Sequence, residues 1–129
     1  MKNILKSILL FTIVSFAMQG TSHFILFKDH YASISFMRKD PILIGGLTAM
    51  VIQGGILGWL YTKMEDVKGW LFGLSMGVFF VIYIALVEPH KYEVPSRLEW
   101  FAIEGFVGMT QFILFGTALG FFIKKENEL

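Results

Sequence analysis

Polar side chains inside otherwise apolar segments are the residues of this sequence most able to do chemistry. Ionisable and amide groups are costly to bury in a lipid bilayer, so they are expected to face a bundle interior or a water-filled cavity. A carboxylate, an imidazole and several amides together could bind and orient a small ligand that carries a protonatable group. The candidate ligand-binding residues are Glu104, His23, Gln19, Gln53, Gln111 and Glu88.

Four long apolar stretches must position these side chains. They cover residues 4–27, 41–61, 68–88 and 97–123, and each is close to the ~20 residues that a helix needs to cross a bilayer. A backbone in lipid must satisfy its hydrogen bonds internally, which favours helices over open sheets. We therefore expect an all-α membrane protein, in which the 129 residues form one compact bundle of four transmembrane helices.

The composition supports a membrane protein and excludes several functions. Hydrophobic residues make up 55% of the chain and charged residues 16%, whereas a soluble domain has roughly 25% charged residues. The net charge of +1 gives no strong field that would attract nucleic acid. The chain has no cysteine, so disulfides, thiolate metal sites and cysteine nucleophiles are excluded.

The orientation follows from the number of spans. Four crossings place both termini on one side of the membrane, and the basic residues then divide almost evenly, six on the terminal side and five on the other. The positive-inside rule favours cytoplasmic termini, and the short loops are typical of a bacterial inner-membrane protein. The basic residues are Lys2, Lys6, Lys63, Lys68, Lys124 and Lys125 against Lys28, Arg38, Lys39, Lys91 and Arg97.

Capping residues predict where the helices begin and end. Asp40 and Pro41 have the order of an N-cap followed by proline in the first turn, which predicts the start of the second span. Ser96 and Glu99 have the spacing of a capping box at the start of the fourth span. Pro89 is expected to end the third span, because proline disfavours a helical residue before it.

The link between the first two spans, residues 28–40, is the longest one. Phe27, Tyr31 and Ile34 recur at helical spacing, which is compatible with a short amphipathic helix lying among the lipid headgroups. An ordinary ordered loop explains the same residues equally well. Trp100, near the start of the fourth span, is expected to anchor that helix at the membrane interface.

The buried polar groups are predicted to gather in one half of the bundle. Glu104 lies eight residues after Ser96, which places it ~12 Å along its helix, and Gln111 lies ~22 Å along. Gln53, twelve residues after Pro41, is ~18 Å along the second span. Glu104 and Gln111 share a helix face, because they are seven residues apart. These groups could form a polar pocket open to the non-cytoplasmic side.

Each polar side chain also has a purely structural explanation. Glu104 could be a hydrogen-bonded staple, with His23, Arg97 or a glutamine as its partner. The three glutamines could simply join neighbouring helices through amide hydrogen bonds. Glu88 is predicted to stand at the mouth of the pocket, near the end of the third span.

Glycine recurs every fourth residue in three of the spans. This spacing lets helix backbones approach closely in a membrane. We expect the glycines to pack helices within one bundle, and the alternative is an interface between copies in a homo-oligomer. The residues are Gly69, Gly73 and Gly77 in the third span, Gly54 and Gly58 in the second, and Gly116 and Gly120 in the fourth.

Metal and catalytic motifs are weak or absent. His23, His30 and His90 could supply nitrogen ligands to a metal or haem, but they lack the spacing of a known metal motif. The sequence contains neither a nucleophile-elbow serine nor a phosphate-binding loop. The sequence therefore does not identify a cofactor, and an enzyme is the less favoured class.

A faint internal repeat links the two halves of the chain. His30 and His90 each lie in the link that follows an odd-numbered span, and Gln53 and Gln111 occupy similar places in the second and fourth spans. This pattern is compatible with duplication of a two-helix unit, as in transporters built from parallel repeats.

The hypothesis that these residues support best is a membrane protein that binds, and could transport, a small amphipathic or protonatable ligand. Glu104 would be its charge partner, while His23 and the glutamines would orient it. One alternative is a structural subunit that docks partners through the glycine faces. Another is a membrane-embedded enzyme acting on a lipid or quinone, with Glu104 and His23 as acid and base.

Overall fold

In the computed structural model, which describes residues 1–125, every regular element is a helix. Four segments are long and apolar enough to cross a membrane, namely Lys2–Leu26, Leu43–Lys63, Gly69–Lys91 and Arg97–Phe122. The predicted all-α membrane bundle with four spans is thereby confirmed. The elements in order are α1 (Lys2–Thr21), η1 (Ser22–Leu26), α2 (Lys28–Ala32), α3 (Leu43–Lys63), α4 (Gly69–Ile82), η2 (Tyr83–Val87), α5 (Glu88–Lys91) and α6 (Arg97–Phe122).

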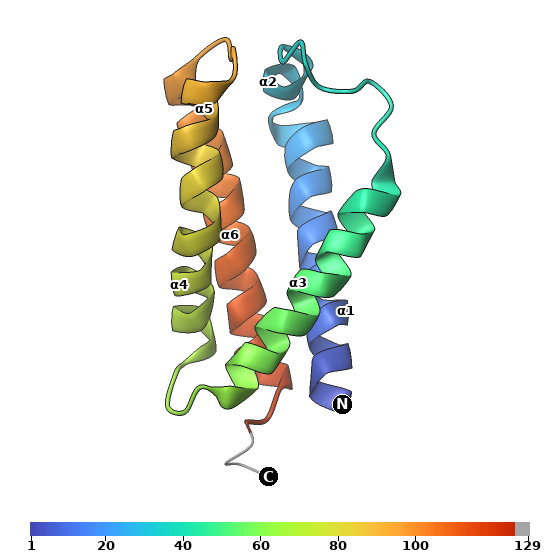
Figure 1. Ribbon diagram of the computed structural model, residues 1–129, viewed down its shortest axis with the longest axis vertical. Coiled ribbons are helices and arrows are strands. Elements are labelled where there is room, and N and C mark those ends of the chain that lie inside the picture. Colours follow the sequence, from blue (N-terminus) through green and yellow to red (C-terminus); the bar gives the residue numbers. More distant parts are fainter. Residues whose placement is uncertain (126–129) are drawn as a thin grey trace.

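The four spans form two antiparallel pairs. α1 packs along α3 and α4 packs along α6, while the two pairs are joined mainly through α1 and α6. The start of α1 and the end of α6 lie at the same end of the bundle (Figure 1), where the Asn3 side chain donates to the Lys124 carbonyl at 2.8 Å. α2 and α5 lie at the opposite end, and α3 leans away from the other helices towards that end (Figure 1).

Backbones approach most closely between α4 and α6. A Cβ atom added at Gly69 would lie 2.7 Å from the Gly120 nitrogen, and one added at Gly73 would lie 3.0 Å from the Gly116 Cα. Gly77 completes this face against the side chain of Met109 and the Cβ of Phe112. All three glycines of α4 therefore pack against a helix of the same chain.

The pair α1 and α3 crosses in the same way. A Cβ at Gly54 would lie 2.9 Å from the Ile8 Cα, and one at Gly58 would collide with the side chain of Ser7. The Ser7 hydroxyl donates to the Gly54 carbonyl at 2.7 Å. The predicted glycine faces are thus occupied within the chain, so a second copy could use them only by replacing these contacts.

The contacts of the two crossings recur at a constant spacing along the chain. Ser7 meets Gly58 in the first pair, and Gly69 meets Gly120 in the second, so both contacts recur 62 positions later. In each half a π-helical turn, η1 or η2, leads from the long helix into a short one. Gln53 and Gln111 are 58 positions apart, whereas the contacts recur after 62. The two glutamines are therefore not equivalent positions of the two pairs, because they differ by about one helical turn.

Some predicted helix ends differ from the structure. The Glu99 N–H donates to the Ser96 hydroxyl at 3.2 Å, as a cap requires. Asp40 and Pro41 do not cap the second span, because α3 begins at Leu43 after an extended Ile42. Pro41 instead contributes to a pocket wall.

Pro89 does not end the third span, contrary to the prediction. η2 ends at Val87, and α5 begins at Glu88 with the proline in its first turn. Pro89 has no N–H to donate, but the π-helical turn before it is wider than an α-helical turn, so the chain continues as a helix to Lys91.

The first part of the link between α1 and α3 covers the end of the bundle, while residues 35–40 are exposed. Tyr31 and Ile34 are buried and pack against Trp100, Ile103 and Val107 of α6. Trp100, predicted as an interface anchor, is only 6% exposed, and its indole N–H donates to the Ile84 carbonyl in η2 at 2.9 Å. A π-helical turn can leave a backbone carbonyl without its usual N–H partner in the helix. In lipid this carbonyl needs another hydrogen-bond donor, which Trp100 supplies to Ile84.

The α4–α6 crossing gives a first prediction. Gly73→Ala should destabilise the protein by about 1–3 kcal/mol, because the added methyl group meets backbone and not a movable side chain. Gly105→Ala is the matched control, since a Cβ at Gly105 would have no neighbour within 4 Å. It should leave stability unchanged or raise it slightly. Thermal unfolding of both variants in detergent measures the difference, and equal stabilities would contradict the close crossing.

Candidate functional site

A chain of amide hydrogen bonds joins the two helix pairs in the half of the bundle nearer to α2 and α5. The Gln19 Nε2 atom donates to Gln111 Oε1 at 2.8 Å, and the Gln111 Nε2 atom donates to the Ser15 hydroxyl at 2.9 Å. Both bonds run between α1 and α6. Such amide bonds stabilise helix association where hydrophobicity cannot, so Gln19 and Gln111 hold the two pairs in register.

Glu104 lies one to two turns from these amides on α6, towards the α2 end. Its Oε1 atom accepts a hydrogen bond of 2.8 Å from the Tyr31 hydroxyl. Within residues 1–125, no lysine, arginine or histidine nitrogen lies within ion-pair distance of it. Glu88 on α5 is close enough to repel it electrostatically. The partners predicted from the sequence, His23, Arg97 or a glutamine, are therefore replaced by a neutral tyrosine.

Tyr31 is the central residue of this network. Its hydroxyl lies 3.4 Å from the Ser22 hydroxyl and donates to Glu104. Its ring stacks on His23 with centroids 3.6 Å apart and an angle of 14°. Burial raises the pKa of the Tyr31 hydroxyl well above its ordinary value, with the Glu104 carboxylate adding to the rise and Ser22 opposing it. Tyr31 therefore keeps its proton and remains a hydrogen-bond donor to Glu104.

The two histidines beside Tyr31 have different environments. His23 Nδ1 lies 2.9 Å from the Gln19 carbonyl oxygen, and because a carbonyl only accepts, this nitrogen carries the proton. The Nε2 atom of His23 is therefore the acceptor nitrogen of the ring. His30 is buried, with Nδ1 3.3 Å from Glu99 Oε1 and no partner for Nε2 within residues 1–125.

Four of the predicted site residues line one cavity. Its volume is about 170 Å³, and its wall combines a carboxylate and three amides with aromatic and aliphatic side chains. The lining residues are Gln19, Gln53, Phe80, Val81, Ile84, Glu104, Gly108, Gln111 and Phe112. The Gln53 side chain has no hydrogen-bond partner among residues 1–125. Its amide is therefore available to a molecule in the cavity.

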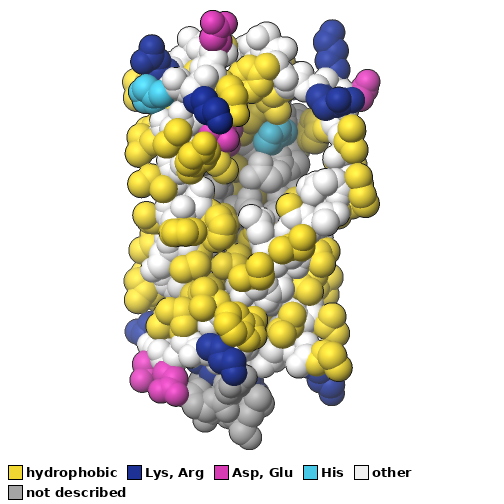
Figure 2. Space-filling model, in the orientation of Figure 1, with side chains coloured by type: hydrophobic (Ala, Val, Ile, Leu, Met, Phe, Trp, Pro, Cys, Tyr) yellow, Lys and Arg dark blue, Asp and Glu magenta, His cyan; other side chains and the backbone are white. Residues whose placement is uncertain are grey.

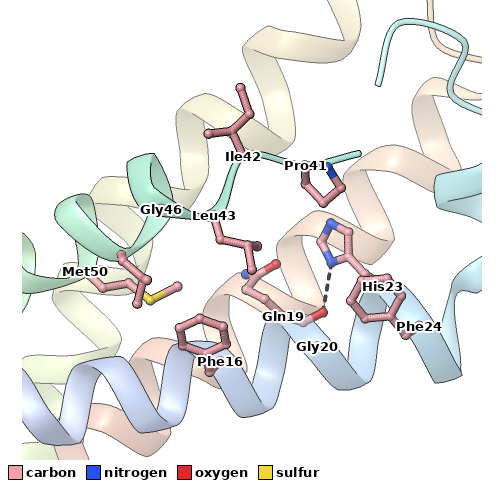
Figure 3. Close-up of a pocket in the computed structure, with 11 residues that line it drawn as sticks. Phe16, Gln19, Gly20, His23, Phe24, Pro41, Ile42, Leu43, Gly46 and Met50 are labelled. Atoms are coloured by element: carbon pink, nitrogen blue, oxygen red, sulfur yellow. Dashed lines mark hydrogen bonds between the residues drawn. The ribbon is translucent and has the colours of Figure 1, made fainter. Parts of the chain in front are cut away.

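A second, larger cavity adjoins the first. It has a volume of about 340 Å³ and lies between α1 and the first turns of α3 (Figure 3). Gln19 lines both cavities. The space-filling view shows this face hollowed in the half nearer to α2, with a histidine side chain in the recess (Figure 2). In the close-up, Gln19 and His23 lie side by side opposite Leu43 and Pro41 (Figure 3).

The other predicted site residues lie outside the polar cavity. His23 lines the second cavity, and Glu88 lies one helical turn beyond Ile84. His90 is exposed on α5, with Nδ1 2.7 Å from the Leu86 carbonyl oxygen. No group of three His, Cys, Asp or Glu side chains in the described part of the chain could hold a metal ion. The histidine metal site therefore has no geometry to support it.

The sequence prediction missed the hydroxyl groups of the network, namely those of Tyr31, Ser15 and Ser22. Serine in an apolar helix gives little signal, because its hydroxyl can bond to its own backbone. Tyr31 did give a signal, since its helical spacing with Ile34 indicated one apolar face. Contact of that face with lipid headgroups was one of two explanations offered for the segment, and in the structure Tyr31 and Ile34 pack against α6.

Comparison with known proteins adds nothing to these observations. No family model, no curated protein and no solved structure matches the chain.

The amide chain gives a second prediction. Gln111→Leu should lower the free energy of unfolding by about 1–2 kcal/mol, because it leaves the Gln19 amide and the Ser15 hydroxyl without their partner. Gln53→Leu is the matched control, since it makes the same change in the same cavity wall without breaking a hydrogen bond. Unfolding in detergent compares the two. An equal loss in both variants would show that the hydrogen bonds do not join the helix pairs.

Proposed function

We propose that this protein binds a small amphipathic or protonatable ligand in the polar cavity, with Glu104 as its charge partner. The observation that carries the proposal is the setting of Glu104. Its carboxylate lies in a cavity wall inside a membrane span and receives a hydrogen bond from a neutral tyrosine, and no cation of residues 1–125 lies within ion-pair distance of it.

A carboxylate in this position favours a ligand for an electrostatic reason. An acidic group inside a span is unfavourable unless it is paired or protonated, and a second carboxylate, Glu88, adds repulsion. A bound cation would compensate this charge. Tyr31 fixes the direction of the carboxylate, and the Gln53 amide could orient the polar part of the ligand.

Binding is better supported than transport. The terminal half of the bundle is filled by buried aromatic side chains, among them Phe11, Phe72 and Phe115, each 1% exposed or less. The cavity lies in the other half. Transport would require this aromatic core to open, so it is the second step of the proposal and depends on the first.

The location belongs to the proposal as well. With both termini in the cytoplasm of a bacterial cell, the cavity would lie in the outer half of the inner membrane. The distribution of basic residues and the short loops support this orientation.

One alternative function has a specific observation in its favour. Tyr31 has His23 stacked on its ring and Glu104 hydrogen-bonded to its hydroxyl, so an acid and a base contact the same tyrosine. This arrangement would suit an enzyme acting on a lipid or quinone. The other alternative, a subunit that docks through its glycine faces, loses its surface because those faces pack within the chain.

The function can be tested by ligand-induced stabilisation. The purified protein is melted in the presence of lipids, quinones, organic cations and haem, as wild type, Glu104→Gln and Glu65→Gln. Glu65→Gln is the matched control, because it makes the same charge change on an exposed residue at the terminal end. A ligand at one hundred times its dissociation constant should stabilise the wild type by about 2.7 kcal/mol.

The expected result is a compound whose stabilising effect persists in Glu65→Gln and disappears in Glu104→Gln. If every compound acts equally on all three proteins, Glu104 is a structural staple and the proposal is wrong. Turnover of a lipid or quinone in reconstituted vesicles that needs both Glu104 and His23 would replace binding by catalysis.

A further inference from the structure

The two adjoining cavities define the chemical class of the ligand. We infer that the site takes an organic cation with one aryl or alkyl tail, which enters sideways from the bilayer. The tail would occupy the larger cavity between α1 and α3, and the cationic group would lie beside Glu104. This inference rests on the proposed function and adds to it the polarity, the shape and the entry route of the ligand.

The larger cavity is suited to an apolar tail. Its volume of about 340 Å³ is in the range of small-molecule sites. Only two side chains of its wall, Gln19 and His23, are polar, and the rest are aliphatic or aromatic, with backbone at two glycines. The apolar lining residues are Phe16, Phe24, Pro41, Ile42, Leu43, Leu47 and Met50.

The position of this cavity favours entry from the membrane. Phe24 is 73% exposed and Leu43 is 60% exposed, and both lie in segments long and apolar enough to span a bilayer. Their outer surfaces therefore face lipid tails and not water. An amphipathic molecule already dissolved in the bilayer could reach the cavity between α1 and α3 without crossing an aqueous phase.

Gln19 connects the apolar cavity to the charged one. It lines both cavities, and its amide is held by Gln111. Beyond it lies Glu104, and no cation within ion-pair distance among residues 1–125 balances its carboxylate. An anionic head group would be repelled there, and a neutral one would leave the carboxylate uncompensated. A cation with an apolar tail compensates the charge of Glu104 and also covers the adjacent apolar surface.

The test uses three probes of similar shape on the full chain in lipid nanodiscs. Phenethyltrimethylammonium is the cation, 3,3-dimethylbutylbenzene is its neutral isostere and 4-phenylbutyrate is the anion. Melting is followed by tryptophan fluorescence. The cation should raise the apparent melting temperature of the wild type at a concentration at least tenfold lower than either other probe requires.

Two adjacent glycines supply a matched pair of variants for the tail. A Cβ atom at Gly45 or Gly46 would meet nothing within 4 Å, so the backbone at both positions leaves room for a side chain to begin. Only Gly46 lines the larger cavity. Gly46→Leu should abolish the shift caused by the cation, and Gly45→Leu should keep it.

The outcomes separate this inference from the proposed function. If the neutral probe stabilises as well as the cation, and Glu104→Gln abolishes both effects, the site exists but its preference for cations is wrong. If the cation raises the melting temperature of Gly46→Leu and of Gly45→Leu by the same amount, the tail does not lie between α1 and α3. If no probe shows an effect that depends on Glu104, while a different compound does, the function stands and the ligand class is overturned.

Discussion

The close backbone crossings near the terminal end of the bundle are the constraint on which the rest of the structure depends. Gly69 and Gly73 touch the backbone of α6, and Gly58 touches Ser7 of α1. Helices that meet so closely at one end must diverge at the other if large side chains lie between them. The inclined α3 marks that divergence (Figure 1). The cavities lie in the space that results.

The divergent end needs a cover, and the network around Tyr31 supplies it. α2 and Ile34 close the gap against α6, and the Tyr31 hydroxyl is directed at Glu104. The same residue therefore closes the end of the bundle and fixes the carboxylate. This dual role explains how an acidic side chain can be tolerated inside a span without a basic partner among residues 1–125.

The sequence predicted the spans well and the site only in part. Apolar length and the Ser96 cap determine the spans, because these signals are local. Gln19, Gln53, Gln111 and Glu104 were predicted to gather, and they line one cavity, because depth along a helix follows from residue number. Tyr31 as the partner of Glu104 could not be predicted, since that contact joins residues 73 positions apart. Pro89 was misjudged because a π-helical turn before it leaves no local signal in residue types.

The repeat of the two helix pairs has a consequence for how the chain could be connected. Each pair makes its own glycine crossing, and Asn3 reaches the carbonyl of Lys124, so the two ends of the fold are neighbours. Joining them and cutting the turn at residues 64–68 would place the second pair first in the chain. Such a circular permutant would keep the contacts of both helix crossings and all hydrogen bonds of the polar network. The site therefore depends on the association of two hairpins and not on the order in which they are synthesised.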